Sequence, residues 1–178
     1  DDSTPKYLNS PDTPVYNKSR NVFALNIAKK SKAGRVILTE GYMDTISLHQ
    51  AGFDSAVASL GTSLTPEHAQ LLSRYFPEAI ISYDGDRAGI AAAQRAIPLL
   101  EKAGLKVRVL QVTGAKDPDE FIKAYGRDAF ARLLDQSTNQ VDYRLDQLKS
   151  QYNLEDDTQR VAFLQGAAQL LSTLSSPV

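Results

Sequence analysis

Six acidic residues occur as three pairs, each in a segment that follows an apolar run. These residues are Glu40, Asp44, Asp84, Asp86, Asp117 and Asp119. Two unit charges about 4 Å apart repel each other by about 4 kcal/mol at an effective dielectric constant of about 20, so such a group would be costly without cations. Magnesium prefers oxygen ligands and commonly bridges carboxylates to substrate phosphates. The pattern therefore favours a divalent-cation site.

Each acid taken alone also fits a helix N-cap, because an Asp before a helix accepts hydrogen bonds from free backbone N–H groups. A cap needs one carboxylate for each helix start, whereas these turns supply the acids in pairs. The pairing favours a metal site for the set. Gly41 and Gly85 either permit close backbone approach or simply form the turns.

The acids are positioned by short apolar runs that alternate with helical stretches. Strands are predicted over residues 36–38, 56–60, 79–83 and 107–110, and helices over 42–51, 65–75, 88–103 and from 118 onward. This alternation predicts an α/β fold: a mostly parallel central sheet of about four strands, with helices on both faces. In such sheets ligands bind beyond the carboxyl ends of the strands, where the acidic residues lie.

The chain divides into three segments in this interpretation. Residues 1–34 are a lead-in, with a loop to residue 16 and then a helix capped by Asn17 that ends near Gly34. Residues 35–136 form the sheet domain. Residues 137–178 show two apolar helical stripes and no strand, and we interpret them as a truncated helical subdomain of a longer protein.

Composition excludes several classes of protein. The chain has 178 residues, no cysteine and only two histidines, so disulfides and thiolate metal sites are excluded, and we assign His49 and His68 no role. No apolar run approaches the roughly 20 residues that a membrane span needs, so we expect a soluble protein without a membrane partner. The net charge of −1 is not typical of a nucleic-acid-binding protein, although Lys and Arg are concentrated before residue 36.

Three motifs carry a resemblance to a known family. Residues 40–44 (EGYMD), 84–89 (DGDRAG) and 117–121 (DPDEF) resemble the three acidic motifs of the Toprim domain, in the form found in bacterial DnaG-type primases. The resemblance extends through residues 6–11, 50–52 and 60–65, and so covers about residues 5–130 in order. A single acidic pair would be weak support, whereas this ordered set is specific.

The resemblance implies an activity and a set of site residues. Glu40, Asp84 and Asp86 would be catalytic and would hold Mg²⁺ or Mn²⁺, with Asp44, Asp117 and Asp119 as supporting acids. The reaction would join nucleoside triphosphates into a short RNA primer on a single-stranded DNA template. Residues expected to contact nucleic acid or nucleotide are Lys6, Tyr7, Asn9, Lys18, Arg20 and Arg87. Thr62 and Ser63 either border the nucleotide site or form a turn before a helix cap at Thr65.

The resemblance also implies partners and missing regions. Zinc is expected only in an N-terminal domain that this chain lacks, and the replicative helicase is expected to bind a C-terminal domain that it also lacks. Guanine nucleotides are plausible regulators, and the protein would act in the bacterial cytoplasm, at the replication fork of the nucleoid. We expect the fragment alone to be inactive or weakly active.

Three other functions use the same acids. Another Toprim enzyme, a nuclease or a topoisomerase fragment, would break phosphodiester bonds, but the segment Lys6–Pro11 resembles primases. A hydrolase of the haloacid dehalogenase type would use Asp84 as a nucleophile and Asp86 as its acid/base partner. A non-catalytic module would bind metal and nucleotide without turnover.

Overall fold

The chain folds into two compact units, the first ending at Ser137 and the second starting at Thr138. The computed structural model describes residues 11–59, 62–112 and 114–172. None of the helices in these ranges is both long enough and apolar enough to cross a lipid bilayer.

The first unit is built on a mostly parallel sheet. Four strands, β2 (Arg35–Thr39), β3 (Ala56–Ser59), β4 (Glu78–Ile81) and β5 (Lys106–Val109), pair in parallel in the order β3-β2-β4-β5. These are the four predicted strands, which confirms the α/β assignment. A fifth strand, β1 (Val22–Phe23), pairs antiparallel with β3 at the edge.

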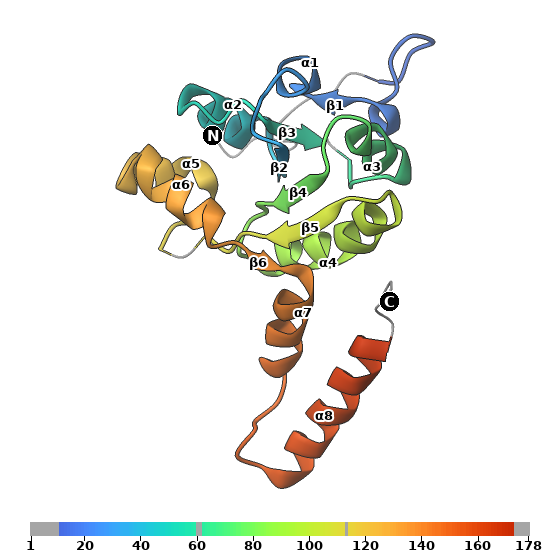
Figure 1. Cartoon of the computed structure of the whole chain (residues 1–178), viewed down its shortest axis with the longest axis vertical. Coiled ribbons are helices and arrows are strands. Elements are labelled where there is room, and N and C mark those ends of the chain that lie inside the picture. Colours follow the sequence, from blue (N-terminus) through green and yellow to red (C-terminus); the bar gives the residue numbers. More distant parts are fainter. Residues whose placement is uncertain (1–10, 60–61, 113, 173–178) are drawn as a thin grey trace. The chain divides into compact units, whose positions relative to one another are not determined.

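Helices cover both faces of this sheet, as predicted. Helices α2 (Tyr42–Gln50), α5 (Pro118–Tyr125) and α6 (Arg127–Asp135) lie on one face, and α3 (Pro66–Ser73) and α4 (Arg87–Lys102) on the other (Figure 1). The core under the first group consists of Ile37, Leu48, Ala56, Ile80, Leu110, Phe121, Phe130 and Leu134. This packing fixes the strand ends from which the acidic residues extend.

The predicted helix from Asn17 to near Gly34 is wrong. Asn17 caps only the short 3-10 helix η1 (Lys18–Arg20), by accepting a hydrogen bond from the Ser19 backbone N–H at 3.0 Å. The chain then forms β1, turns at Ala24 with a φ of 62°, and forms the single-turn helix α1 (Leu25–Ala28). Pairing of Val22 with Ser59 of β3 overrides the local helical pattern here.

Helix α3 begins at Pro66 after the Thr65 cap, as predicted, and its first turn holds η1 in place. His68 completes a capping box with Thr65, and its Nε2 lies 2.7 Å from the Lys18 carbonyl oxygen. Thr65 Oγ1 donates to the Ser19 carbonyl oxygen at 2.7 Å. His68, to which the sequence assigned no role, therefore fastens the lead-in to α3.

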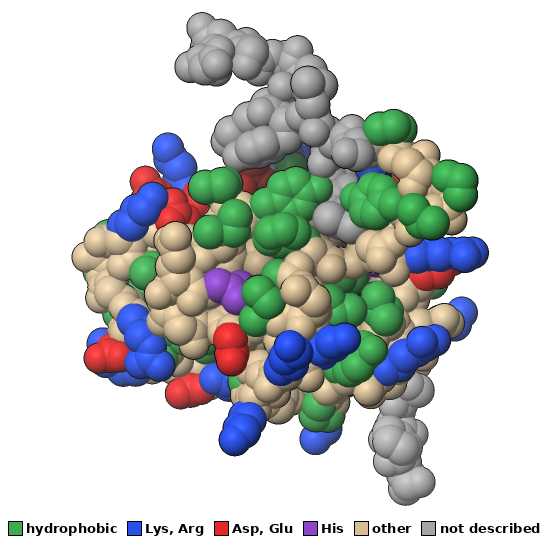
Figure 2. Space-filling model, turned by 90° about the horizontal axis from the view of Figure 1, so that it is seen from above, with side chains coloured by type: hydrophobic (Ala, Val, Ile, Leu, Met, Phe, Trp, Pro, Cys, Tyr) green, Lys and Arg blue, Asp and Glu red, His purple; other side chains and the backbone are tan. Residues whose placement is uncertain are grey.

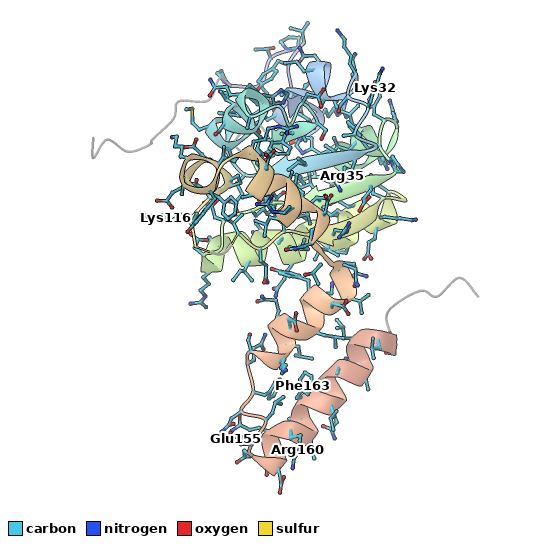
Figure 3. All side chains as sticks on the ribbon, turned by 60° about the vertical axis from the view of Figure 1, so that its left-hand side comes forward. Lys32, Arg35, Lys116, Glu155, Arg160 and Phe163 are labelled. Carbon is cyan, nitrogen blue, oxygen red and sulfur yellow. The ribbon has the colours of Figure 1, made fainter. Side chains whose placement is uncertain are left out.

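The second unit contains two helices, α7 (Gln140–Lys149) and α8 (Asp157–Ser172). The prediction of no strand after residue 137 is wrong at β6 (Thr138–Asn139), which is too short for a strand periodicity to show in the sequence. Within this unit Phe163 lies on the side of α8 that faces α7 (Figure 3), with its ring centroid 6.2 Å from that of Tyr152.

Candidate metal centre and flanking cavity

The first two acidic motifs meet where β2 and β4 end. Glu40 follows β2 directly, and its Oε1 accepts a hydrogen bond from the Asp84 backbone N–H at 3.3 Å, beyond the end of β4. The two strands are neighbours in the sheet, so their carboxyl ends bring residues 44 positions apart into contact. The predicted clustering of these motifs is therefore a consequence of strand order.

A glycine in the first turn of α4 makes this approach possible. A Cβ at Gly89 would lie 2.2 Å from the Asp84 carbonyl oxygen and 2.7 Å from Glu40 Oε1, distances that no side chain tolerates. Gly85, singled out from the sequence, has open space around it. The close approach therefore depends on Gly89, four residues later, and not on Gly85.

The electrostatics show that the acids interact. Burial, then the charges of Asp84, Asp86 and Asp44, raise the pKa of Glu40 above its ordinary value. Burial, followed by the charges of Asp117, Asp84 and Asp119, raises the pKa of Asp44 to about 6. Negative charge is thus concentrated beyond the strand ends.

This donor set fits a hydrated divalent cation. All of the donors are carboxylate oxygens, which suit Mg²⁺ and Mn²⁺, and a nearby cation would relieve the repulsion that raises the pKa values of Glu40 and Asp44. Within the described part of the chain, no three acids or histidines converge on a ready-made ligand cage.

Two of the six acids also cap helices, so the N-cap interpretation of the sequence is correct for each of these two acids. Asp86 Oδ1 accepts from the Gly89 backbone N–H at 2.7 Å and caps α4. Asp117 Oδ1 accepts from the Glu120 backbone N–H at 2.8 Å and caps α5. Each of these hydrogen bonds engages one oxygen of its carboxylate.

Asp119 has a different environment from the other acids. Its carboxylate accepts hydrogen bonds from Ser47 Oγ and from Lys123 Nζ, both at 2.6 Å, and these two contacts lower its pKa. Ser47 belongs to α2, whereas Asp119 and Lys123 both belong to α5, so the Ser47 hydrogen bond joins the two helices. Its charge is already compensated.

The residues predicted to bind nucleic acid are spread over several elements. Lys18 and Arg20 lie in η1 beside α3, and Arg87 is the first residue of α4, next to the acidic strand end. The predicted contacts at Lys6, Tyr7 and Asn9 fall outside the described residues. On the face seen in Figure 2, Lys and Arg side chains lie at several places around the edge, some beside Asp or Glu.

A cavity of about 500 Å³ lies beside Glu40. Its lining residues are Glu40, Ser59, Thr62, Ser63, Leu64, Tyr83, Ala88, Ala92, Arg95, Ala96 and Leu99. The sequence pointed to Thr62 and Ser63 as a nucleotide border, but it gave no sign of Arg95 or Tyr83. Ala88, Ala92 and Leu99 are spaced so that they lie on one side of α4. That spacing is the only local signal in the sequence that could have indicated that α4 lines a cavity.

Comparison with known proteins identifies the family. Residues 37–122 match the Toprim-like family model, and residues 141–178 match the model of the DnaB-helicase binding domain of primase. The chain is 42% identical over 175 residues to a DNA primase of Clostridium acetobutylicum, which covers 98% of this chain and 29% of that protein. The chain belongs to the bacterial DnaG-type primase family.

Solved primase structures share the fold. The DnaG primase catalytic domain bound to single-stranded DNA matches with a TM-score of 0.82 and 35% identity, over 99% of this chain and 59% of that one. The zinc-binding and RNA polymerase domains of the Aquifex aeolicus primase match with a TM-score of 0.78 and 36% identity, over 99% of this chain and 47% of that chain. The curated Clostridium primase is more than three times as long as the matched region, since the chain spans only 29% of it.

One expectation about the domains needs correction. We expected the helicase-binding region to be missing from the chain, yet residues 141–178 match the model of that domain. A two-helix segment carries too little sequence signal to separate the end of a polymerase domain from the start of a helicase-binding one.

Proposed function

We propose that the chain is the metal-holding part of a primase core, which joins nucleoside triphosphates into short RNA primers on single-stranded DNA. The observation that carries the proposal is the contact between Glu40 and Asp84 where β2 and β4 end, with Asp86 two residues further on. Burial, and then the charges of both aspartates, raise the pKa of Glu40, and perturbed carboxyl groups of this kind are common at functional sites.

In this proposal each acid has a defined task. Glu40, Asp84 and Asp86 hold Mg²⁺ or Mn²⁺, and Asp44 and Asp117 add negative charge around them. The bound cation would supply charge neutralisation at the triphosphate and lower the pKa of the attacking hydroxyl. Asp119 keeps α5 against α2 through its hydrogen bond from Ser47, and its ion pair with Lys123 lies within α5.

The reaction is a nucleotidyl transfer. The oxygen of the primer 3′-hydroxyl forms a bond with the α-phosphorus of the incoming nucleotide, and the bond from that phosphorus to the β-phosphate bridging oxygen breaks. Pyrophosphate leaves and the hydroxyl proton passes to solvent. The protein contributes positioning and electrostatic stabilisation, and no covalent enzyme intermediate is needed.

Nucleic-acid contacts would come from basic side chains near the acids. We propose that Arg87, Lys18 and Arg20 contact phosphates, together with Lys6, Tyr7 and Asn9 of the lead-in. Phosphate contacts by Lys and Arg are independent of sequence and sensitive to salt, as movement along a template requires. The solved primase domain with bound single-stranded DNA supports this partner.

Further partners are part of the same proposal. The helicase is proposed to contact the second unit, because residues 141–178 match the helicase-binding model. Zinc is proposed to belong to a separate domain, as in the Aquifex protein, since this chain has no cysteine. Guanine nucleotides would compete with nucleoside triphosphates, and the protein would act at the replication fork in the cytoplasm.

The test is the loss of primer synthesis on Asp84→Asn or Asp86→Asn, in a chain that also carries the other regions of its relatives. Each change removes a ligand charge without creating a cavity, and Asn is itself a good N-cap, so α4 should still form. We expect a loss of roughly 100-fold or more, with no fall in the melting temperature of the metal-free chain.

Asp128→Asn, an exposed acid of α6 whose side chain is 83% exposed, is the control and should keep the wild-type rate. Wild-type rates in both Asp84→Asn and Asp86→Asn would contradict the metal assignment. Phosphatase activity of the wild-type chain, with an aspartyl-phosphate trapped on Asp84, would instead support the hydrolase alternative.

A further inference from the structure

The cavity beside Glu40 has two walls of different chemistry. Ser59 at the end of β3, with Thr62 and Ser63 in the loop that follows, supplies one wall of hydroxyl groups. Helix α4 supplies the other, where the small side chains of Ala88 and Ala92 leave room for a ligand. The volume of about 500 Å³ is within the range of roughly 300–1,000 Å³ found for small-molecule sites.

Arg95 is the cation of this cavity. Its guanidinium forms no hydrogen bond or ion pair with any residue in the described part of the chain, whereas Arg35 and Arg108 each pair with an acid. Holding an arginine without an acidic partner at the edge of a cavity leaves its five N–H donors available to a ligand. The planar guanidinium suits phosphate oxygens, which it can bind through two parallel hydrogen bonds.

Glu40 connects this cavity to the acidic cluster. An anion entering the cavity would be repelled by Glu40 unless a cation lies on the carboxylates. A divalent cation held by Glu40, Asp84 and Asp86 would supply positive charge beside the cavity and so favour a phosphate ligand. Within the cavity, Arg95 and the hydroxyl groups of Thr62 and Ser63 would supply hydrogen-bond donors to the same ligand.

We propose that this cavity binds the pyrophosphate end of the incoming nucleoside triphosphate, and later the pyrophosphate product, through Arg95, Thr62 and Ser63. The inference rests on the proposed function and adds a phosphate-binding residue, Arg95, to it. Inorganic pyrophosphate is the smallest ligand that carries the two linked phosphate groups that this proposal assigns to the cavity.

The experiment measures pyrophosphate binding to the 178-residue chain by calorimetry, with magnesium present. Arg95→Ala should raise the dissociation constant of pyrophosphate about tenfold or more, as expected for loss of a charge-assisted phosphate contact. Arg95→Lys should give an intermediate dissociation constant, because lysine keeps the positive charge but lacks the paired N–H donors of the planar guanidinium group. Lys102→Ala, on the same helix but outside the cavity, should stay within about twofold of wild type.

A second measurement separates the anion site from the metal site. Manganese affinity, followed by the paramagnetic signal of the free ion, should be unchanged in Arg95→Ala and lost in Glu40→Gln/Asp84→Asn. Pyrophosphate affinity that is equal in wild type and Arg95→Ala, or no pyrophosphate binding by wild type, would overturn the inference.

The two proposals fail in distinguishable ways. If Asp84→Asn abolishes primer synthesis while Arg95→Ala binds pyrophosphate normally, the function stands and the Arg95 site does not. If pyrophosphate binding depends on Arg95 but Asp84→Asn leaves primer synthesis intact, the anion site stands and the metal assignment fails.

Discussion

His68 is a single residue that joins two parts of the fold. It is fully buried, its Nδ1 accepts from the Thr65 backbone N–H at 3.3 Å, and its Nε2 lies 2.7 Å from the Lys18 carbonyl oxygen. Because Nδ1 is an acceptor, Nε2 carries the proton and donates it to Lys18, which requires the neutral ring. Burial, the largest cause, lowers the pKa of His68 below its ordinary value.

We predict that His68→Ala destabilises the chain by about 2–4 kcal/mol at pH 8, through the cavity and the unpaired Lys18 carbonyl. As the pH falls below about 6.5, the unfolded chain takes up a proton on His68 before the folded chain does, so wild type loses stability. The difference between wild type and His68→Ala should therefore shrink from pH 8 to pH 5.

Thermal or urea unfolding at several pH values measures this difference. Thr65→Ala is the control, because it weakens the same cap by about 1 kcal/mol without removing the titrating group, and its difference from wild type should not vary in this way. A difference for His68→Ala that is constant with pH would show that the ring does not need to be neutral.

Helix α8 is an element with two apolar sides. Phe163 and Gly166 face α7, where a Cβ at Gly166 would lie 3.2 Å from Leu148 Cδ2. Val161 and Leu164, three residues apart, are 54% and 58% exposed, and Leu171 is 48% exposed one heptad after Leu164. Exposed apolar residues at this spacing are typical of a helix that meets a partner helix.

We predict that Leu164→Glu weakens binding of the replicative helicase about tenfold, because it places a charge in the exposed stripe. The melting temperature should be nearly unchanged, since the leucine is exposed. Gln165→Glu adds the same charge beside the stripe and should have little effect. Equal losses in the two variants would point to charge alone, and no loss in either would place the helicase contact elsewhere.

At the scale of the whole molecule, magnesium binding is coupled to stability. A ligand that binds only the folded chain stabilises it by RT ln(1 + [L]/Kd), so ~10 mM magnesium with a Kd of ~1 mM gives about 1.4 kcal/mol. For a chain of this length we predict a rise of roughly 3 to 6 °C in melting temperature. Sodium at equal ionic strength should give less, because it screens without coordination.

In Glu40→Gln/Asp84→Asn, magnesium should no longer raise the melting temperature; we call this rise the magnesium increment. The metal-free variant should melt above wild type, because a repelling pair of charges is gone. Thermal melts with and without magnesium measure both effects. Asp128→Asn/Glu155→Gln removes two charges from exposed positions and should keep the wild-type increment. An equal increment in all three proteins would mean that magnesium binds elsewhere.

The sequence by itself determined the strands and helices of the sheet, the acidic strand ends and the family. Apolar periodicity and turn residues are local signals, so the four parallel strands and the Thr65 cap could be predicted within a residue or two. The clustering of Glu40 with Asp84 could also be predicted, because parallel strands bring their carboxyl ends to one edge.

Only the tertiary structure decided what each of these residues does. Pairing with β3 made Val22 and Phe23 an edge strand where the local pattern favours a helix. Contacts with Ser47 and Lys123 lowered the pKa of Asp119, while burial raised that of Asp44. Arg95 lines the same cavity as Glu40 and Ser63. Apart from the Asp119–Lys123 pair, which lies four residues apart on α5, each outcome depends on residues far apart in the chain, whose interaction has no signature in local sequence.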